Sequence, residues 1–153
     1  MSVKKDKKIS WIIPCLNEEK VILETLERIR RVSEKINKFD WELILIDDGS
    51  SDNTRKIIKE IADYPFKLTL LSFSRNFGHQ PAVQAGIDNC SGSAAIIIDA
   101  DLQDPPEIAE EMIDKWEKGY DVVYGQRSIR HQENLFKKFT AFLFYRVLNF
   151  FSG

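Results

Sequence analysis

Short apolar runs rich in β-branched residues alternate along this chain with segments of helical periodicity, and this alternation restricts the fold more than any other feature. The helical segments repeat apolar residues every three or four positions, as Ile22, Leu26 and Ile29 do. Alternation of strand and helix predicts an α/β fold with a doubly wound, mostly parallel sheet between two helical layers. The predicted strands are residues 9–13, 42–46, 67–73, 94–98 and 121–124.

Length, charge and cysteine content limit the possible functions. The 153 residues, 43% of them hydrophobic, are enough for one domain, which we expect over 9–134 after a basic extension at 1–8. A net charge of −2 is too balanced for a nucleic-acid binder. Cys15 and Cys90 form no CxxC pair, which argues against a zinc site and fits a reducing compartment. Since we see no signal peptide and no run of about 20 apolar residues, we expect a location in the cytoplasm or on the cytoplasmic face of a membrane.

An acidic loop follows the fourth predicted strand. Ligands of parallel α/β sheets bind beyond the carboxyl ends of the strands, so residues in this position are candidate site residues. Asp99, Asp101 and Gln103 offer hard oxygen ligands for Mg²⁺ or Mn²⁺ that also holds phosphate oxygens. Such an ion neutralises a diphosphate both on binding and on departure. Asp104, before Pro105, is interpreted as a helix cap.

The loops after the first two strands are also acidic. Asp47 and Asp48 are adjacent carboxylates that repel each other, so cations or hydrogen-bond donors must satisfy them. A nucleotide base with an N–H donor can satisfy Asp48, while residues 51–52 can cap the next helix. Glu18 either contacts a nucleotide or, with Asn17 as the cap, suits the positive end of a helix. Both interpretations of Glu18 are open at this point.

Three residues outside the acidic loops are also candidates for a structural or functional role. Arg127 follows the last predicted strand and either holds a phosphate through its planar paired donors or forms a surface salt bridge. His79, beside Gly78 at a predicted helix start, is interpreted as structural rather than as a catalytic base. Gly86 is expected to permit close packing of a helix on the sheet.

The end of the chain, residues 135–153, is predicted to be an aromatic helix that carries Lys137, Lys138 and Arg146. It is too short and too charged to span a membrane comfortably. Either it lies as an amphipathic helix on an anionic membrane surface, or it packs as a core helix against strands beyond residue 153. The two interpretations are compatible.

Taken together, these motifs resemble the family-2 inverting glycosyltransferases, which have the GT-A fold. The resemblance is carried by Pro14-x-x-Asn17-Glu18 and by residues 47–54, 99–107 and 125–127. Within the family, the chain is most similar to the polyprenyl-phosphate hexosyltransferases, namely the dolichol-phosphate mannose synthases and the bactoprenol glucosyltransferases. Residues 74–79 and the tail favour the bactoprenol branch.

The resemblance implies transfer of a hexose from a UDP- or GDP-sugar, with UDP-glucose favoured, to a polyprenyl phosphate with inversion. It implies catalytic roles for Asp101 and Arg127, Arg127 holding the diphosphate or the acceptor phosphate, and a metal site at Asp101 and Gln103. It also implies that the acceptor region and membrane segments follow residue 153, so that this chain is an amino-terminal part. The residues expected to bind the nucleotide sugar are Pro14, Leu16, Glu18, Ile46, Asp48, Asp99, Ala100, Asp101 and Arg127.

Other functions were weighed against this one. A saccharide hydroxyl as acceptor would need a general base, and none stands out in this sequence. A nucleotidyltransferase would carry a Gly-rich loop after the first strand, where residues 14–19 contain no glycine. A phospho-receiver domain would place its acidic pair after the first strand, whereas here the pair follows the second. A nucleotide-sugar-binding fragment without activity of its own also remains open.

Overall fold

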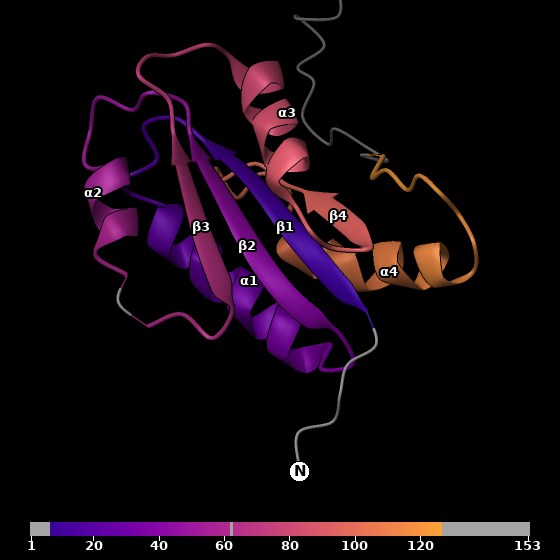
Figure 1. Ribbon diagram of the computed structural model, residues 1–153. Coiled ribbons are helices and arrows are strands. Elements are labelled where there is room, and N and C mark those ends of the chain that lie inside the picture. Colours follow the sequence, from indigo (N-terminus) through magenta and orange to yellow (C-terminus); the bar gives the residue numbers. More distant parts are fainter. Residues whose placement is uncertain (1–6, 62, 127–153) are drawn as a thin grey trace, which may run out of the picture. The chain divides into compact units, whose positions relative to one another are not determined.

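The computed structural model describes residues 7–61 and 63–126. Four strands form one parallel sheet in the order β3-β2-β1-β4 (Figure 1). The strands are β1 (Lys8–Cys15), β2 (Asp40–Asp47), β3 (Lys67–Ser72) and β4 (Ala94–Ile97). The helices are α1 (Ile22–Lys35), α2 (Thr54–Lys59), α3 (His79–Asn89), the 3-10 helix η1 (Pro106–Ile108) and α4 (Ala109–Glu117).

Contacts within the chain define two units, Met1–Val123 and Tyr124–Gly153. All the elements above belong to the first unit. The predicted helix at 135–153 and Arg127 lie outside the described residues, so the predicted domain boundary at residue 134 stays a prediction.

The core has two parts because the sheet has helices on both faces. Helices α1 and α4 lie behind the sheet in Figure 1, and α3 lies in front of it. The larger cluster behind the sheet includes Trp11, Leu43 and Leu45, which are fully buried. Burial on both faces explains why β1 and β2 are nearly continuous apolar runs rather than alternating ones. The α/β/α layering predicted from the sequence is confirmed.

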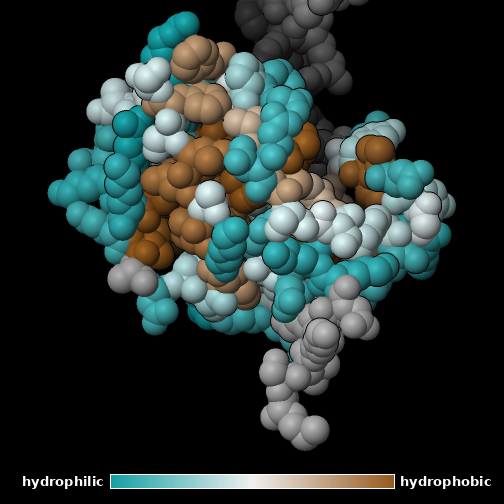
Figure 2. Space-filling model, viewed as in Figure 1, coloured by the Kyte–Doolittle hydropathy of each residue, from teal (hydrophilic) through white to brown (hydrophobic). Residues whose placement is uncertain are grey.

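On the front face, α3 packs directly on the sheet through Gly86. A Cβ at this position would lie 2.3 Å from Cγ2 of Ile12 and 2.9 Å from Cδ1 of Ile46, so glycine permits the close contact that was predicted. Among the described helices, α3 alone covers this face. Hydrophobic side chains therefore remain visible over the strands beside it (Figure 2).

The predicted strand at 121–124 does not form. Residues 121–126 have no regular structure, and β4 pairs with β1 alone among the described strands. The apolar pattern of this segment favours a half-buried, pleated surface, but a strand also has to pair with a neighbouring strand. Helix α4 ends just before Gly119, which adopts the left-handed region with φ of 94°.

The order of the strands creates a switch point beside β1. The chain proceeds from β1 to β2 to β3 in one direction and then crosses back through α3 to place β4 on the other side of β1. Connections on opposite faces leave a crevice beyond the carboxyl ends of β1 and β4.

Candidate nucleotide-sugar site

A pocket of about 340 Å³ lies at this switch point. Its walls are the loops after β1 and β4, the loop after β2, and the start of α3. The pocket gathers seven of the residues predicted from the sequence. They are Pro14, Leu16, Glu18, Asp48, Asp99, Ala100 and Asp101.

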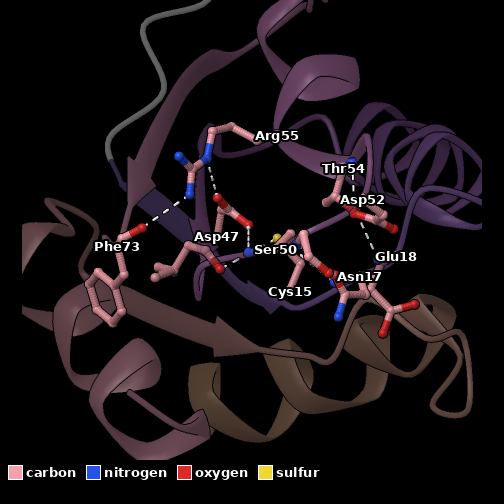
Figure 3. A network of polar contacts seen from close by, with 11 residues as sticks. Cys15, Asn17, Glu18, Asp47, Ser50, Asp52, Thr54, Arg55 and Phe73 are labelled. Carbon is pink, nitrogen blue, oxygen red and sulfur yellow. Dashed lines mark hydrogen bonds and ion pairs between the residues drawn. The ribbon is translucent and has the colours of Figure 1, made fainter. Parts of the chain in front are cut away.

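The loops after β1 and β2 are joined by hydrogen bonds that run in both directions (Figure 3). The backbone N–H of Glu18 donates to Oγ1 of Thr54 over 2.8 Å, and the backbone N–H of Glu19 donates to Asp52 over 3.1 Å. In return, Oδ1 of Asn17 accepts from the backbone N–H and from the hydroxyl of Ser51. We call this set of contacts, between residues 17–19 and 50–54, the loop latch.

The loop latch explains the role of Asn17, which is not the helix cap that one interpretation predicted. Helix α1 begins at Ile22, so Asn17 does not cap it. Asn17 instead adopts φ of 59° and connects the two loops, a conformation that asparagine tolerates better than most residues. Glu18 contributes its backbone to the latch, and its side chain lines the pocket.

Asp52 is bonded to the first residue of α2, but the residue at the N-cap position is Asn53 rather than one of the predicted residues 51–52. Its Oδ1 accepts from the backbone N–H of Thr54 over 3.0 Å and from the Thr54 hydroxyl over 2.6 Å. One carboxylate therefore holds the start of α2 and, through Glu19, the loop after β1.

The adjacent carboxylates Asp47 and Asp48 each have donors, as their repulsion requires. Asp47 is fully buried and pairs with Nε of Arg55, which also donates to the carbonyl of Phe73 (Figure 3). Asp48 is 4% exposed and accepts from the backbone N–H groups of Phe77 and Gly78 over 2.7 and 2.9 Å. Asp48 thus fixes the chain just before α3 while it lines the pocket.

The acidic loop after β4 is tied to helix α1. The hydroxyl of Thr25, fully buried, donates to the carbonyl of Ala100 over 2.7 Å. Oδ1 of Asp101 accepts from the backbone N–H of Gln103 over 3.0 Å, and Leu102 between them adopts φ of 60°. A left-handed leucine costs of order 1–3 kcal/mol, and such strain clusters at ligand sites.

Negative charge is concentrated in the pocket. Burial raises the pKa of Glu18 above its ordinary value, and the charges of Asp101, Asp52 and Asp99 raise it further. Carboxylates that disfavour each other's ionisation in this way suit a divalent cation, which prefers oxygen ligands and relieves the repulsion. The donor set of the pocket therefore fits Mg²⁺ or Mn²⁺.

A cation here would need oxygens from a ligand or from water as well. Within residues 7–61 and 63–126, no three His, Cys, Asp or Glu side chains are placed to hold one ion together. Mg²⁺ in nucleotide sites is often held by one or two carboxylates together with substrate phosphates.

Two predicted site residues do not line the pocket, and a third lies outside the described residues. Ile46 is fully buried in the cluster on which α3 packs, beneath the pocket rather than in its wall. Gln103 is exposed and does not line the pocket. Arg127 lies outside the described residues.

The pocket also contains residues that the sequence did not single out for binding. His79 was interpreted as structural, yet its Nε2 lies 2.8 Å from Oδ1 of Asp99. Cys15, the last residue of β1, is 4% exposed, and burial followed by nearby carboxylate charges raises the pKa of its thiol to about 12. The remaining additions are Asn76, Gly78 and Ala82.

The fold is that of the GT-A glycosyltransferases. The mannosyltransferase PcManGT from Pyrobaculum calidifontis, solved in complex with GDP-Man and Mn²⁺, matches with a TM-score of 0.63 and 25% identity. The match covers 76% of this chain and 34% of that chain. The model of glycosyl transferase family 2 matches residues 10–152, and the chain belongs to this family.

Two curated relatives cover nearly the whole chain. It is 47% identical over 140 residues to the uncharacterized glycosyltransferase YkcC of Bacillus subtilis, covering 92% of this chain and 43% of that protein. It is 42% identical over 142 residues to the bactoprenol glucosyl transferase of Shigella phage SfV, covering 93% of this chain and 46% of that protein. The chain thus spans less than half the length of these relatives. Within its described part, no helix has the length and apolar character needed to cross a bilayer.

Proposed function

We propose that this chain forms the donor-binding part of an enzyme that transfers a hexose from a nucleoside diphosphate sugar to a polyprenyl phosphate with inversion. The observation that carries the proposal is the convergence of Glu18, Asp99 and Asp101 in one pocket at the switch point of the sheet. A sugar nucleotide matches this pocket because its hydroxyls can donate to carboxylates, and because the same carboxylates would hold a divalent cation that would neutralise the charge of the diphosphate. UDP-glucose is the favoured donor, on the likeness to proteins named bactoprenol glucosyl transferase.

The chain's own residues have distinct roles in this proposal. Pro14, Leu16, Glu18 and Asp48 hold the nucleoside, and Ile46 supports them from beneath. Asp99 and Ala100 face the ribose and diphosphate, and Arg127 holds a phosphate. Asp101 and Gln103 would hold Mg²⁺ or Mn²⁺, which when bound supplies charge neutralisation for the departing diphosphate.

A phosphate acceptor simplifies the proton chemistry. The second pKa of a phosphate monoester is about 6, so the acceptor is already an anion at neutral pH. The protein then has to align donor and acceptor and exclude water, and no strong base is required. A saccharide hydroxyl as acceptor would need such a base.

The donor claim is tested by a thermal-shift panel of UDP-glucose, GDP-mannose and a CDP-sugar, each with and without Mn²⁺. We expect the largest rise in melting temperature with UDP-glucose and Mn²⁺ together. No rise with any nucleotide sugar would reject the donor site. The acceptor claim needs the full-length protein and radiolabelled UDP-glucose, with label passing into the organic phase when undecaprenyl phosphate is present.

We also propose that residues 135–153 bring the protein to a membrane surface, on the basis of their aromatic and basic sequence. Deletion of this segment should reduce sedimentation with vesicles that contain anionic lipid. Full sedimentation of the shortened protein would remove the segment from this role.

A further inference from the structure

His79 occupies a distinctive place in the pocket. Among the described residues that line it, His79 carries the one imidazole side chain. Its imidazole and the side chain of Asp99 are each about half exposed, at 53% and 50%, so both are within reach of a ligand. A carboxylate oxygen can only accept, so Nε2 of His79 must carry the hydrogen and donate it to Asp99.

The backbone before His79 is held firmly. Asp48 accepts from the N–H groups of Phe77 and Gly78, and His79 is the first residue of α3. Gly49 packs so closely on this segment that a Cβ there would lie 2.4 Å from the carbonyl carbon of Arg75. The imidazole therefore starts from a fixed point and reaches across the end of β1 to the loop after β4.

Asp99 and Asp101 are held by different means. Asp101 accepts from the backbone of its own turn, at Gln103. Within the described residues, Asp99 has its hydrogen bond from His79 alone. Removal of the imidazole would free the Asp99 carboxylate and leave Asp101 in place.

We infer that His79 is a positioning residue, which holds the Asp99 carboxylate in the orientation that binds the hydroxyls of the donor's nucleoside or sugar. This inference rests on the proposed function for the identity of the ligand. His79 acts through Asp99 and takes no proton from the acceptor. Asp99 therefore binds the donor, and Asp101 remains available to hold the cation.

The test is a double-mutant cycle on the full chain, measured by calorimetry with UDP-glucose and Mn²⁺. His79→Ala should weaken binding roughly three- to tenfold, the cost of ordering one freed side chain on binding. His79→Gln, which keeps an N–H donor at similar reach, should restore most of the loss. In an Asp99→Ala background, His79→Ala should have no further effect. Gln80→Ala, an exposed neighbour on the same turn of α3, is the matched control.

Two results would overturn the inference. One is an equal effect of His79→Ala with and without Asp99, and the other is a His79→Gln protein no better than His79→Ala. If the Asp99→Ala protein binds UDP-glucose too weakly to measure, the inference is still tested by comparing the affinities of His79→Gln and His79→Ala.

The pair is also measured without a ligand. Long-range ¹H–¹⁵N spectra should show hydrogen on Nε2 of His79, and Asp99→Ala should change that tautomer population. His131→Gln removes the other histidine signal. If the spectra show that His79 does not interact with Asp99, the inference is rejected, but the proposed function is not. A wild-type chain that binds no nucleotide sugar rejects the proposed function, whatever the spectra show.

Discussion

Asn17 and Ser51 are joined across two loops by two hydrogen bonds to one oxygen atom. Oδ1 of Asn17 accepts from the backbone N–H of Ser51 over 2.8 Å and from its hydroxyl over 3.1 Å. Asn17 also donates its own N–H to Oγ of Ser50 over 2.9 Å. Asn17, which lies in the left-handed region, is therefore one of the residues that connect the loops after β1 and β2.

Asn17→Ala should destabilise the protein by about 2–3 kcal/mol, because two hydrogen bonds are lost and alanine is disfavoured at positive φ. Asn17→Gly removes the same hydrogen bonds and accepts the backbone conformation, so it should lose about 1 kcal/mol less. Urea unfolding of both variants measures the difference. Equal losses would mean that the backbone conformation at position 17 contributes nothing.

Gly49→Ala should destabilise by more than about 2 kcal/mol, since the added methyl group meets the backbone of residues 75–76 and φ is +76°. Gly119→Ala is the matched control, because φ there is +94° and no atom lies within 4 Å of the added group. Gly119→Ala should lower the free energy of unfolding only by the cost of placing alanine at positive φ, about 1 kcal/mol. Similar melting temperatures for the two variants would show that the loop of residues 75–76 can move away.

Asp101→Ala should abolish the part of UDP-glucose affinity that depends on Mn²⁺, because it removes the proposed carboxylate ligand. Calorimetry with and without Mn²⁺ measures this directly. Asp114→Ala, an exposed carboxylate on α4, controls for the change in net charge. A metal dependence that survives in Asp101→Ala would place the cation elsewhere.

Glu42 should make stability depend on pH in the acid range. This carboxylate is 3% exposed and accepts from the hydroxyls of Ser10 and Ser91 over 2.6 and 2.8 Å. Desolvation opposes its ionisation, but those hydrogen bonds, the Ser91 N–H and the charge of Lys8 outweigh it, so the pKa of Glu42 lies below its ordinary value of 4.5. The folded state therefore gains stability above pH 4.5 and loses it as the pH falls through the lowered pKa.

Glu42→Gln should lower stability at pH 7 by about 2 kcal/mol and by much less at pH 3. Urea unfolding at the two pH values tests this, with exposed Glu111→Gln as the control. The same loss at both pH values would show that the charge of Glu42 does not stabilise the fold.

The sheet was predictable because its strands appear in the sequence as local runs of apolar residues. Strands β1 and β2 are buried on both faces, so Ile9, Trp11 and Leu43 belong to nearly continuous apolar runs, which are typical of strands in a parallel sheet. The acidic residues of the pocket were predictable for a related reason. Parallel strands bring their carboxyl ends to one edge of the sheet, and Asp48 and Asp99, which follow two of these strands, both line the pocket.

The contacts between loops were not predictable from local pattern. The hydrogen bond of His79 to Asp99 depends on how far α3 crosses over the sheet, which no spacing in the sequence records. The Asn17–Ser51 contact likewise joins residues 34 positions apart. The strand expected at 121–124 shows the opposite case, since its apolar pattern is present but the segment pairs with no described strand.

At position 18, the backbone takes part in the loop latch and the side chain lines the pocket. Glu18 contributes to the loop latch only through its backbone N–H, which every residue except proline provides. Its side chain is thus free to vary without loosening the loop. Position 18 is consequently a site where altered ligand preference can evolve, or be engineered, at little cost to folding, whereas change at Asn17 or Asp52 would affect the architecture first.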